Sequence, residues 1–137
     1  AYWSLDHKDG DEKAYCCFNS NARDFARFGQ LYLDSGRWKG KQLVPEGYVL
    51  NSIKPADLLE EDGKKKINKY GYSWWLLPGY KGQRIFYARG ILGQYIIVVP
   101  EKNMVIVRLG KIRDKTTGED HPRDVLQYID CALAMYP

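Results

Sequence analysis

The sequence predicts an α+β fold, in which two helices precede an antiparallel sheet of about four strands and a C-terminal helix packs on that sheet. Three observations support this prediction. Residues 22–32 carry apolar side chains at spacings of three and four, residues 70–109 contain four apolar segments joined by short links, and residues 125–136 return to the helical spacing. We expect a helical region with its loop over 1–69, and strands with the terminal helix over 70–137.

The first helix has clear start and stop signals. Asn19, Ser20 and Asn21 offer side chains that can cap the free amides of a first turn, where Asp24 also suits the helix dipole. Gly36 supplies a left-handed stop. The apolar stripe between these signals consists of Ala22, Phe25, Ala26, Phe28, Leu31 and Tyr32.

A second, shorter helix is expected directly after the first. Pro45 suits a first helical position, and the helix must end before Pro55, because the residue before a proline avoids helical geometry. Residues 54–69 are charged and lack periodicity, so we expect a loop there.

Four strands are expected in the second half of the chain. They are Tyr70–Leu77, Ile85–Arg89, Gln94–Val99 and Met104–Leu109. A turn is expected over Pro78–Gly82 and a tight connection over Pro100–Asn103, and such short links force antiparallel neighbours. The run Tyr95–Val99 is almost wholly apolar, which predicts a strand covered on both faces. Residues 120–122 then open an amphipathic last helix that suits packing on a sheet.

The composition excludes several classes of protein. Of the 137 residues, 45% are apolar and 28% are charged, which excludes a disordered chain, a collagen-like fibre and a disulfide-dense miniprotein. The apolar run Ile96–Pro100 is far shorter than the ~20 residues that a membrane-spanning helix needs. The 21 basic and 17 acidic side chains give a net charge of +4, too small an excess to indicate nucleic-acid binding.

The cysteines are Cys16, Cys17 and Cys131, an odd number that leaves at least one thiol unpaired within the chain. Adjacent cysteines rarely bridge each other, because the local geometry is strained. We therefore expect the cysteines to pack as small, buried apolar side chains. No cysteine or histidine lies at a spacing typical of zinc ligands, so no metal site is predicted.

No self-contained catalytic motif is present. None of the five serines begins a Ser-x-x-Lys motif or lies within Gly-x-Ser-x-Gly. The two histidines, His7 and His121, stand alone in the sequence, and we expect structural or solvated roles for both.

The most unusual segment is Phe86–Tyr95, in which Gly90 and Gly93 interrupt sequence typical of strands. Glycine in such a pattern indicates a bulge or the close approach of a ligand to the backbone. On pattern alone, a simple hairpin turn is the alternative interpretation.

This segment and the following Ile97–Val107 resemble the C-terminal half of the penicillin-recognising serine hydrolases. That family includes class C β-lactamases, D-Ala-D-Ala carboxypeptidases, related esterases and 6-aminohexanoate-oligomer hydrolases. The other matching stretches are Ala22–Leu33, Gly36–Gly40, Pro45–Glu46 and Tyr70–Trp75. They occur in the family's order, so the resemblance extends over about residues 20–110.

The resemblance implies a fragment of the β-lactamase/transpeptidase-like fold and a serine hydrolase that cleaves amide or ester bonds by acyl transfer. Of the family's three motifs, only the Lys-Thr-Gly element has a counterpart, at 88–90, where Ala88 replaces the usual Lys or His. Ile91 aligns with the residue whose backbone N–H forms half of the oxyanion hole. The expected substrate-binding residues are Ala88, Arg89, Gly90, Gly93 and Gln94.

The Ser-x-x-Lys and Tyr-x-Asn motifs are absent, and the chain starts abruptly with Ala1-Tyr2-Trp3. We therefore expect a C-terminal fragment that is inactive alone. Its expected partners are a small-molecule or peptide substrate, the missing N-terminal part of the same protein, and a second copy joined through an exposed sheet edge. We expect no nucleic acid, membrane span or cofactor. The resemblance also implies export, for example to the periplasm.

A non-catalytic binding module, or a degenerate family member that recognises peptide or glycan, is the alternative function. Aromatic residues make up 14% of the chain. The tryptophans are Trp3, Trp38, Trp74 and Trp75. Such rings bind sugars and peptides when exposed, but they also fill a core between a sheet and its helices.

Overall fold

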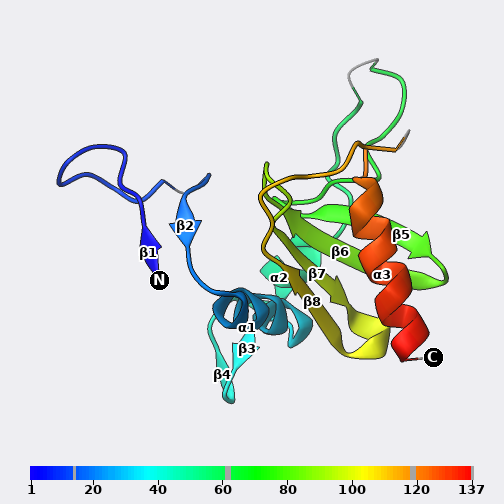
Figure 1. Ribbon diagram of the computed structural model, residues 1–137, viewed down its shortest axis with the longest axis horizontal. Coiled ribbons are helices and arrows are strands. Elements are labelled where there is room, and N and C mark those ends of the chain that lie inside the picture. Colours follow the sequence, from blue (N-terminus) through cyan, green and yellow to red (C-terminus); the bar gives the residue numbers. More distant parts are fainter. Residues whose placement is uncertain (14, 61–62, 118–119, 137) are drawn as a thin grey trace.

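The computed structural model describes residues 1–13, 15–60, 63–117 and 120–136, and its architecture is the predicted α+β arrangement (Figure 1). The strands are β1 (Tyr2–Trp3), β2 (Phe18–Asn19), β3 (Arg37–Trp38), β4 (Lys41–Gln42), β5 (Trp75–Tyr80), β6 (Gln83–Arg89), β7 (Tyr95–Val99) and β8 (Met104–Arg108). The helices are α1 (Ala22–Leu33), α2 (Glu46–Ser52), the 3₁₀ turn η1 (Pro100–Lys102) and α3 (Arg123–Met135).

The main sheet has four strands in the order β5-β6-β7-β8, each antiparallel to its neighbour. Ile97 lies at its centre, opposite Tyr87 of β6 on one side and Ile106 of β8 on the other. The predicted strand number, order and pairing are thereby confirmed, because each connection is short enough to force hairpin pairing.

Two helices cover the two faces of this sheet. Val125 and Ile129 of α3 pack on the face that carries Tyr87 and Ile97, whereas Tyr32 and Leu33 of α1 pack on the face that carries Phe86 and Val98. Successive strand residues point to opposite faces, so β7 contacts both helical layers. All five residues of β7 are buried, as the apolar run predicted.

The first helix begins and ends where its signals lie. Asn21 is the N-cap residue, and its side-chain oxygen accepts a hydrogen bond from the Asp24 amide at 3.1 Å. Within α1, Gly29 is the one fully buried residue, and a β-carbon there would lie 2.6 Å from Val105 Cγ1 and 2.9 Å from Ile96 Cγ2. Gly29 therefore lets the helix backbone approach the sheet closely.

The β5–β6 hairpin differs from the prediction at its turn. The strand expected over Tyr70–Leu77 begins at Trp75 and runs on through Pro78 to Tyr80, so the turn predicted for Pro78–Gly82 is confirmed only at its last two residues. A bulge between Pro78 and Tyr80 and the position of β5 at the sheet edge accommodate the proline, which has no N–H to donate. The turn itself consists of Lys81 and Gly82, both at positive φ, as in type I′ hairpins.

Two small hairpins were not predicted. Tyr2 and Trp3 of β1 pair with Asn19 and Phe18 of β2, and β3 pairs with β4 after α1. Each of these strands has only two residues, which is too short for a periodic pattern. Figure 1 shows the β1–β2 hairpin (blue) projecting away from the main sheet.

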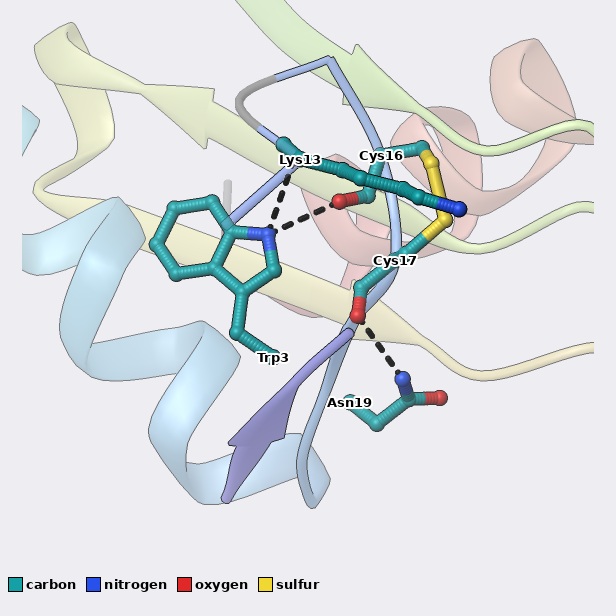
Figure 2. Close-up of a disulfide and its surroundings, with 5 residues drawn as sticks. All are labelled: Trp3, Lys13, Cys16, Cys17 and Asn19. Atoms are coloured by element: carbon teal, nitrogen blue, oxygen red, sulfur yellow. Dashed lines mark hydrogen bonds between the residues drawn. A yellow bond between two sulfur atoms is a disulfide. The ribbon is translucent and has the colours of Figure 1, made fainter. Parts of the chain in front are cut away.

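The cysteines contradict the expectation of unbridged, buried side chains. Cys16 and Cys17 form a disulfide with each other (Figure 2). The free Cys131 is exposed on α3. The loop around the disulfide is braced by Trp3, whose indole N–H donates to the carbonyl oxygens of Lys13 (2.9 Å) and Cys16 (2.8 Å). With φ at +73°, Cys17 adopts a backbone conformation that no sequence pattern indicated.

The helical part and the sheet share one core. Ile53 after α2 joins α1 in packing on the cluster around Trp74 and Phe86, so residues on both sides of position 69 contribute to it. The boundary at 69 stays a prediction. Among the described residues, no helix is both long enough and apolar enough to cross a membrane.

Replacing Gly29 with alanine should lower the free energy of unfolding by about 1–3 kcal/mol, because the new methyl group overpacks the contact with Val105 and Ile96. Urea denaturation followed by circular dichroism measures this change. The matched control is Gly47→Ala in α2, where a β-carbon has no neighbour within 4 Å and alanine's helix propensity adds up to ~1 kcal/mol. Equal stability of the two variants would contradict the close approach of α1 to the sheet.

The disulfide predicts a specific thiol count. The denatured but unreduced chain should take up iodoacetamide at Cys131 alone, and after reduction at all three cysteines. Mass spectrometry of the intact chain measures the number of adducts. Cys131→Ser is the control and should take up none before reduction, so label on Cys16 or Cys17 at that stage would disprove the bridge.

Candidate functional site

The segment singled out by the sequence forms the connection between β6 and β7. Gly90–Gly93 is a four-residue turn, closed by a hydrogen bond from the Gly93 amide to the Gly90 carbonyl at 3.2 Å. The Gly90 amide donates to the Gln94 carbonyl at 2.8 Å, and the Leu92 amide donates to the Gln94 side-chain oxygen at 3.2 Å. The alternative interpretation of this segment as a simple hairpin turn is therefore confirmed for its backbone.

Ile91 occupies the second position of this turn, where its N–H makes no hydrogen bond to another residue that the structure describes. Ile91 is 81% exposed, so its side chain is not part of the protein core. The amides of the three neighbours 90, 92 and 93 are all bonded within the β6–β7 hairpin. The turn therefore has one backbone donor that is not bonded to the described residues, and a free donor is what the binding of a developing oxyanion requires.

The two glycines have close neighbours inside the protein. A β-carbon at Gly90 would lie 2.3 Å from Gln94 Oε1, and one at Gly93 would lie 2.1 Å from Arg108 Nη1. Gly93 also has φ at +82°, a conformation that favours glycine. Close approach explains Gly93, where a β-carbon would also lie 2.6 Å from the Ile112 carbonyl oxygen, whereas the neighbour of Gly90 is the flexible Gln94 side chain. The contact of both glycines with a substrate stays a prediction.

The side chains of Ala88 and Arg89 lie on opposite faces of β6. Ala88 packs on the cluster beneath α1. Arg89 lies with its guanidinium carbon 3.5 Å from the centre of the Trp75 ring and donates a hydrogen bond to the Asp120 carbonyl at 2.7 Å. The positive charge of Arg89 is therefore held over Trp75, near the start of α3.

Gln94 ties the turn to the segment that follows β8. Its side-chain N–H donates to the Gly110 carbonyl at 3.0 Å, while its side-chain oxygen accepts from the Leu92 amide. The amide group of Gln94 thus bridges two loops, and any contact with a substrate stays a prediction.

Arg108 was not anticipated as part of this site. Its Nη1 donates to the Gly93 carbonyl at 2.5 Å and to the Ile112 carbonyl at 3.0 Å, and its Nε donates to the Tyr128 hydroxyl at 3.1 Å. One signal could have indicated it, because Arg108 is the single charged residue in the otherwise apolar segment 104–109.

Two polar pairs, one buried and one partly buried, lie on the α3 side of the sheet. The Tyr87 hydroxyl and His121 Nδ1 are 2.9 Å apart, and the Tyr95 hydroxyl donates to Asp124 Oδ1 at 3.0 Å. Burial raises the pKa of the Tyr87 phenol, and burial together with the bond to Asp124 raises the pKa of the Tyr95 phenol. Both hydroxyls stay protonated at neutral pH and join the sheet to the start of α3.

An open hollow of about 640 Å³ borders the turn. It is lined by Ile91, Leu92, Lys111, Ile112, Arg113, Asp114, Lys115 and Thr116. The hollow joins the exposed side of the turn to a loop that carries three basic side chains and one acidic side chain. In the described part of the chain, no three His, Cys, Asp or Glu side chains gather as metal ligands.

No family model matches the chain, but known proteins are similar to it. The 6-aminohexanoate-dimer hydrolase of Paenarthrobacter ureafaciens is 29% identical over 105 residues, which are 73% of this chain and 26% of the enzyme. A solved structure from Bacillus anthracis, provisionally named a 6-aminohexanoate-dimer hydrolase, is 28% identical with a TM-score of 0.56. It covers 83% of this chain, which matches 27% of that protein.

The chain thus spans about a quarter of the length of each relative. The shared residues and the shared fold agree with each other, and both relatives are named as hydrolases. The two comparisons therefore confirm the resemblance of this chain to the penicillin-recognising serine hydrolases, among them the 6-aminohexanoate hydrolases.

Proposed function

We propose that this chain forms one wall of the acyl-transfer site of a serine hydrolase that cleaves amide or ester bonds. The observation that carries the proposal is the Ile91 N–H, which makes no bond to the described residues, on a turn whose other amides are all bonded. Alignment of Ile91 with the family's oxyanion-hole residue and the similarity to two proteins named as hydrolases support the same assignment.

In the proposed reaction, a serine hydroxyl attacks the substrate carbonyl and passes its proton to a neighbouring base. The carbonyl oxygen becomes an oxyanion, which the Ile91 N–H stabilises by donating a hydrogen bond. The amine or alcohol leaves with a proton, and water then hydrolyses the acyl-serine ester. No Ser-x-x-Lys motif lies in these residues, so the proposal places the nucleophile and its base on polypeptide outside them.

The first substrate to test is a linear amide, since both relatives are named for a 6-aminohexanoate dimer. Ala88 stands where the lactamase pattern has Lys or His, and its side chain packs toward α1. This departure favours amides and esters over a dedicated β-lactam substrate.

The proposal includes a protein partner at the sheet edge. In the described part of the chain, β8 pairs with β7 on one side and with no strand on the other (Figure 1). An unpaired edge presents backbone donors and acceptors to a further strand. We propose that this edge receives a strand from the rest of the protein or, failing that, from a second copy.

Export to an oxidising compartment such as the periplasm is also part of the proposal. The disulfide between Cys16 and Cys17 supports it, because disulfides persist mainly in such compartments.

A binding module is the second candidate, favoured by aromatic side chains near the start of α1. Phe18 and Phe28 are 41% and 44% exposed, and with Trp38 they help line a hollow of about 600 Å³. Aromatic surfaces of this kind suit peptides or glycans. Against this candidate, Trp74 is buried in the core and Trp75 lies beneath Arg89. A Ser-x-x-Lys motif upstream in the same gene would favour the enzyme.

The 137 residues alone should show no catalytic turnover, because they contain no activated serine. Nitrocefin, p-nitrophenyl acetate and the linear dimer of 6-aminohexanoate are suitable substrates, followed by absorbance or by release of the amine. Heat-denatured chain is the control for nonspecific ester cleavage. Saturable turnover that disappears on denaturation would contradict the placement of the nucleophile elsewhere.

In a longer polypeptide that carries both a Ser-x-x-Lys motif and this chain, Ile91→Pro should lower kcat by about 10²–10³, the effect of losing one oxyanion donor. Proline suits the second position of a turn, and the Ile91 N–H has no bond to lose among the described residues, so the fold should persist. Ile91→Ala keeps the amide and is the matched control. Equal activity of the two variants would exclude the Ile91 N–H from the reaction.

A further inference from the structure

Arg108 lies outside the β6–β7 hairpin and donates a hydrogen bond to the turn that carries Ile91, at the Gly93 carbonyl. It lies at the end of β8, and its side chain is 25% exposed. The two N–H groups of Nη1 are both used, one toward the Gly93 carbonyl and one toward the Ile112 carbonyl. Nε donates to Tyr128 of α3, which anchors the guanidinium at its other end.

Two glycines, Gly93 and Gly110, leave space for this guanidinium. A β-carbon at Gly93 would lie 2.1 Å from Nη1, and a β-carbon at Gly110 would lie 2.1 Å from Nη1 and 2.4 Å from Cζ. The three nearest atoms at Gly110 all belong to Arg108, and Gly110 has no positive φ that would require glycine. Gly110 is therefore explained by the position of the Arg108 side chain.

A simple surface ion pair does not account for these contacts. The closest carboxylate oxygen, Asp124 Oδ2, lies 3.7 Å from Nη1, beyond hydrogen-bond distance, and Asp124 already accepts from Tyr95. The shortest contacts of Arg108 are to the two loop carbonyls. Charged donors form stronger hydrogen bonds than neutral donors. We therefore expect these two bonds to contribute more to the order of the exposed turn than its few packing contacts do.

We propose that Arg108 is a positioning residue, which holds the turn 90–93 against the segment 110–112 and so sets the direction of the Ile91 N–H. The catalytic part of this inference rests on the proposed function, because an oxyanion donor must be held close to its working position. The mechanical part does not depend on it. A turn whose side chains Ile91 and Leu92 are exposed has few packing contacts, so its order depends on hydrogen bonds.

The test is amide hydrogen exchange by NMR on the 137-residue chain, without substrate. In Arg108→Gln, exchange at the Leu92 and Gly93 amides should accelerate about tenfold, as expected for losing hydrogen bonds to a charged group. Backbone order parameters at Leu92 and Gly93 should also fall, whereas those at Ile97 and Val98 in the buried strand β7 should stay as in the wild type. The Ile91 amide resonance should shift, which reports its altered orientation.

A second variant breaks the same contact without altering Arg108. Gly110→Ala should displace the guanidinium and reproduce the effect of Arg108→Gln on the turn. In the double variant, Gly110→Ala should add nothing, because the group it displaces is already absent. Arg108→Lys keeps the charge but not the forked donors, and should restore the turn only in part.

Two controls match these changes. Arg84→Gln removes an arginine whose ion pair with Glu101 is exposed, and Gly47→Ala adds a methyl group in open space. Neither should alter exchange in the turn. Wild-type exchange in the turn of Arg108→Gln, an equal loss of order in the turn and in β7, or additive effects in the double variant would each overturn the proposal. An ordered turn without hydrolysis in the longer polypeptide would instead count against the proposed function alone.

Discussion

The fold depends on the burial of β7 between two helices. Its five residues contact α3 with one set of alternating side chains and α1 with the other, and every one of them is buried. Because apolar surface on both faces of this strand is removed from water, its burial stabilises the fold more than burial of one face would. The close approach of α1 at Gly29 and the docking of α3 through Val125 and Ile129 both follow from covering this one strand.

The same strand places the candidate site. The turn that carries Ile91 leads directly into β7, so the buried strand gives the turn a rigid base at Tyr95. Arg108 at the end of β8 and Gln94 directly before β7 join the turn to the loop that follows β8. An exposed turn with little packing of its own is thereby held by directed hydrogen bonds from ordered elements.

Much of the architecture could be predicted from the sequence, because its signals are local. The cap at Asn21 confirms the start of α1, and the continuous apolar run 95–99 confirms a strand covered on both faces. The path of β5 through Pro78 could not be predicted, since a proline is tolerated there only because β5 is an edge strand. The bridge between Cys16 and Cys17 was also missed, because its backbone conformation is set by the surrounding loop.

For the site, the sequence by itself determined the location of the turn, the absence of a Ser-x-x-Lys motif and the alignment of Ile91 with a known backbone donor. Only the tertiary structure decided what the neighbouring side chains contact. Arg89 turned out to lie over Trp75, and Arg108 proved to bond to Gly93. The physical reason is distance along the chain: the partners are 14 and 15 residues apart, and only the pairing of strands brings them together.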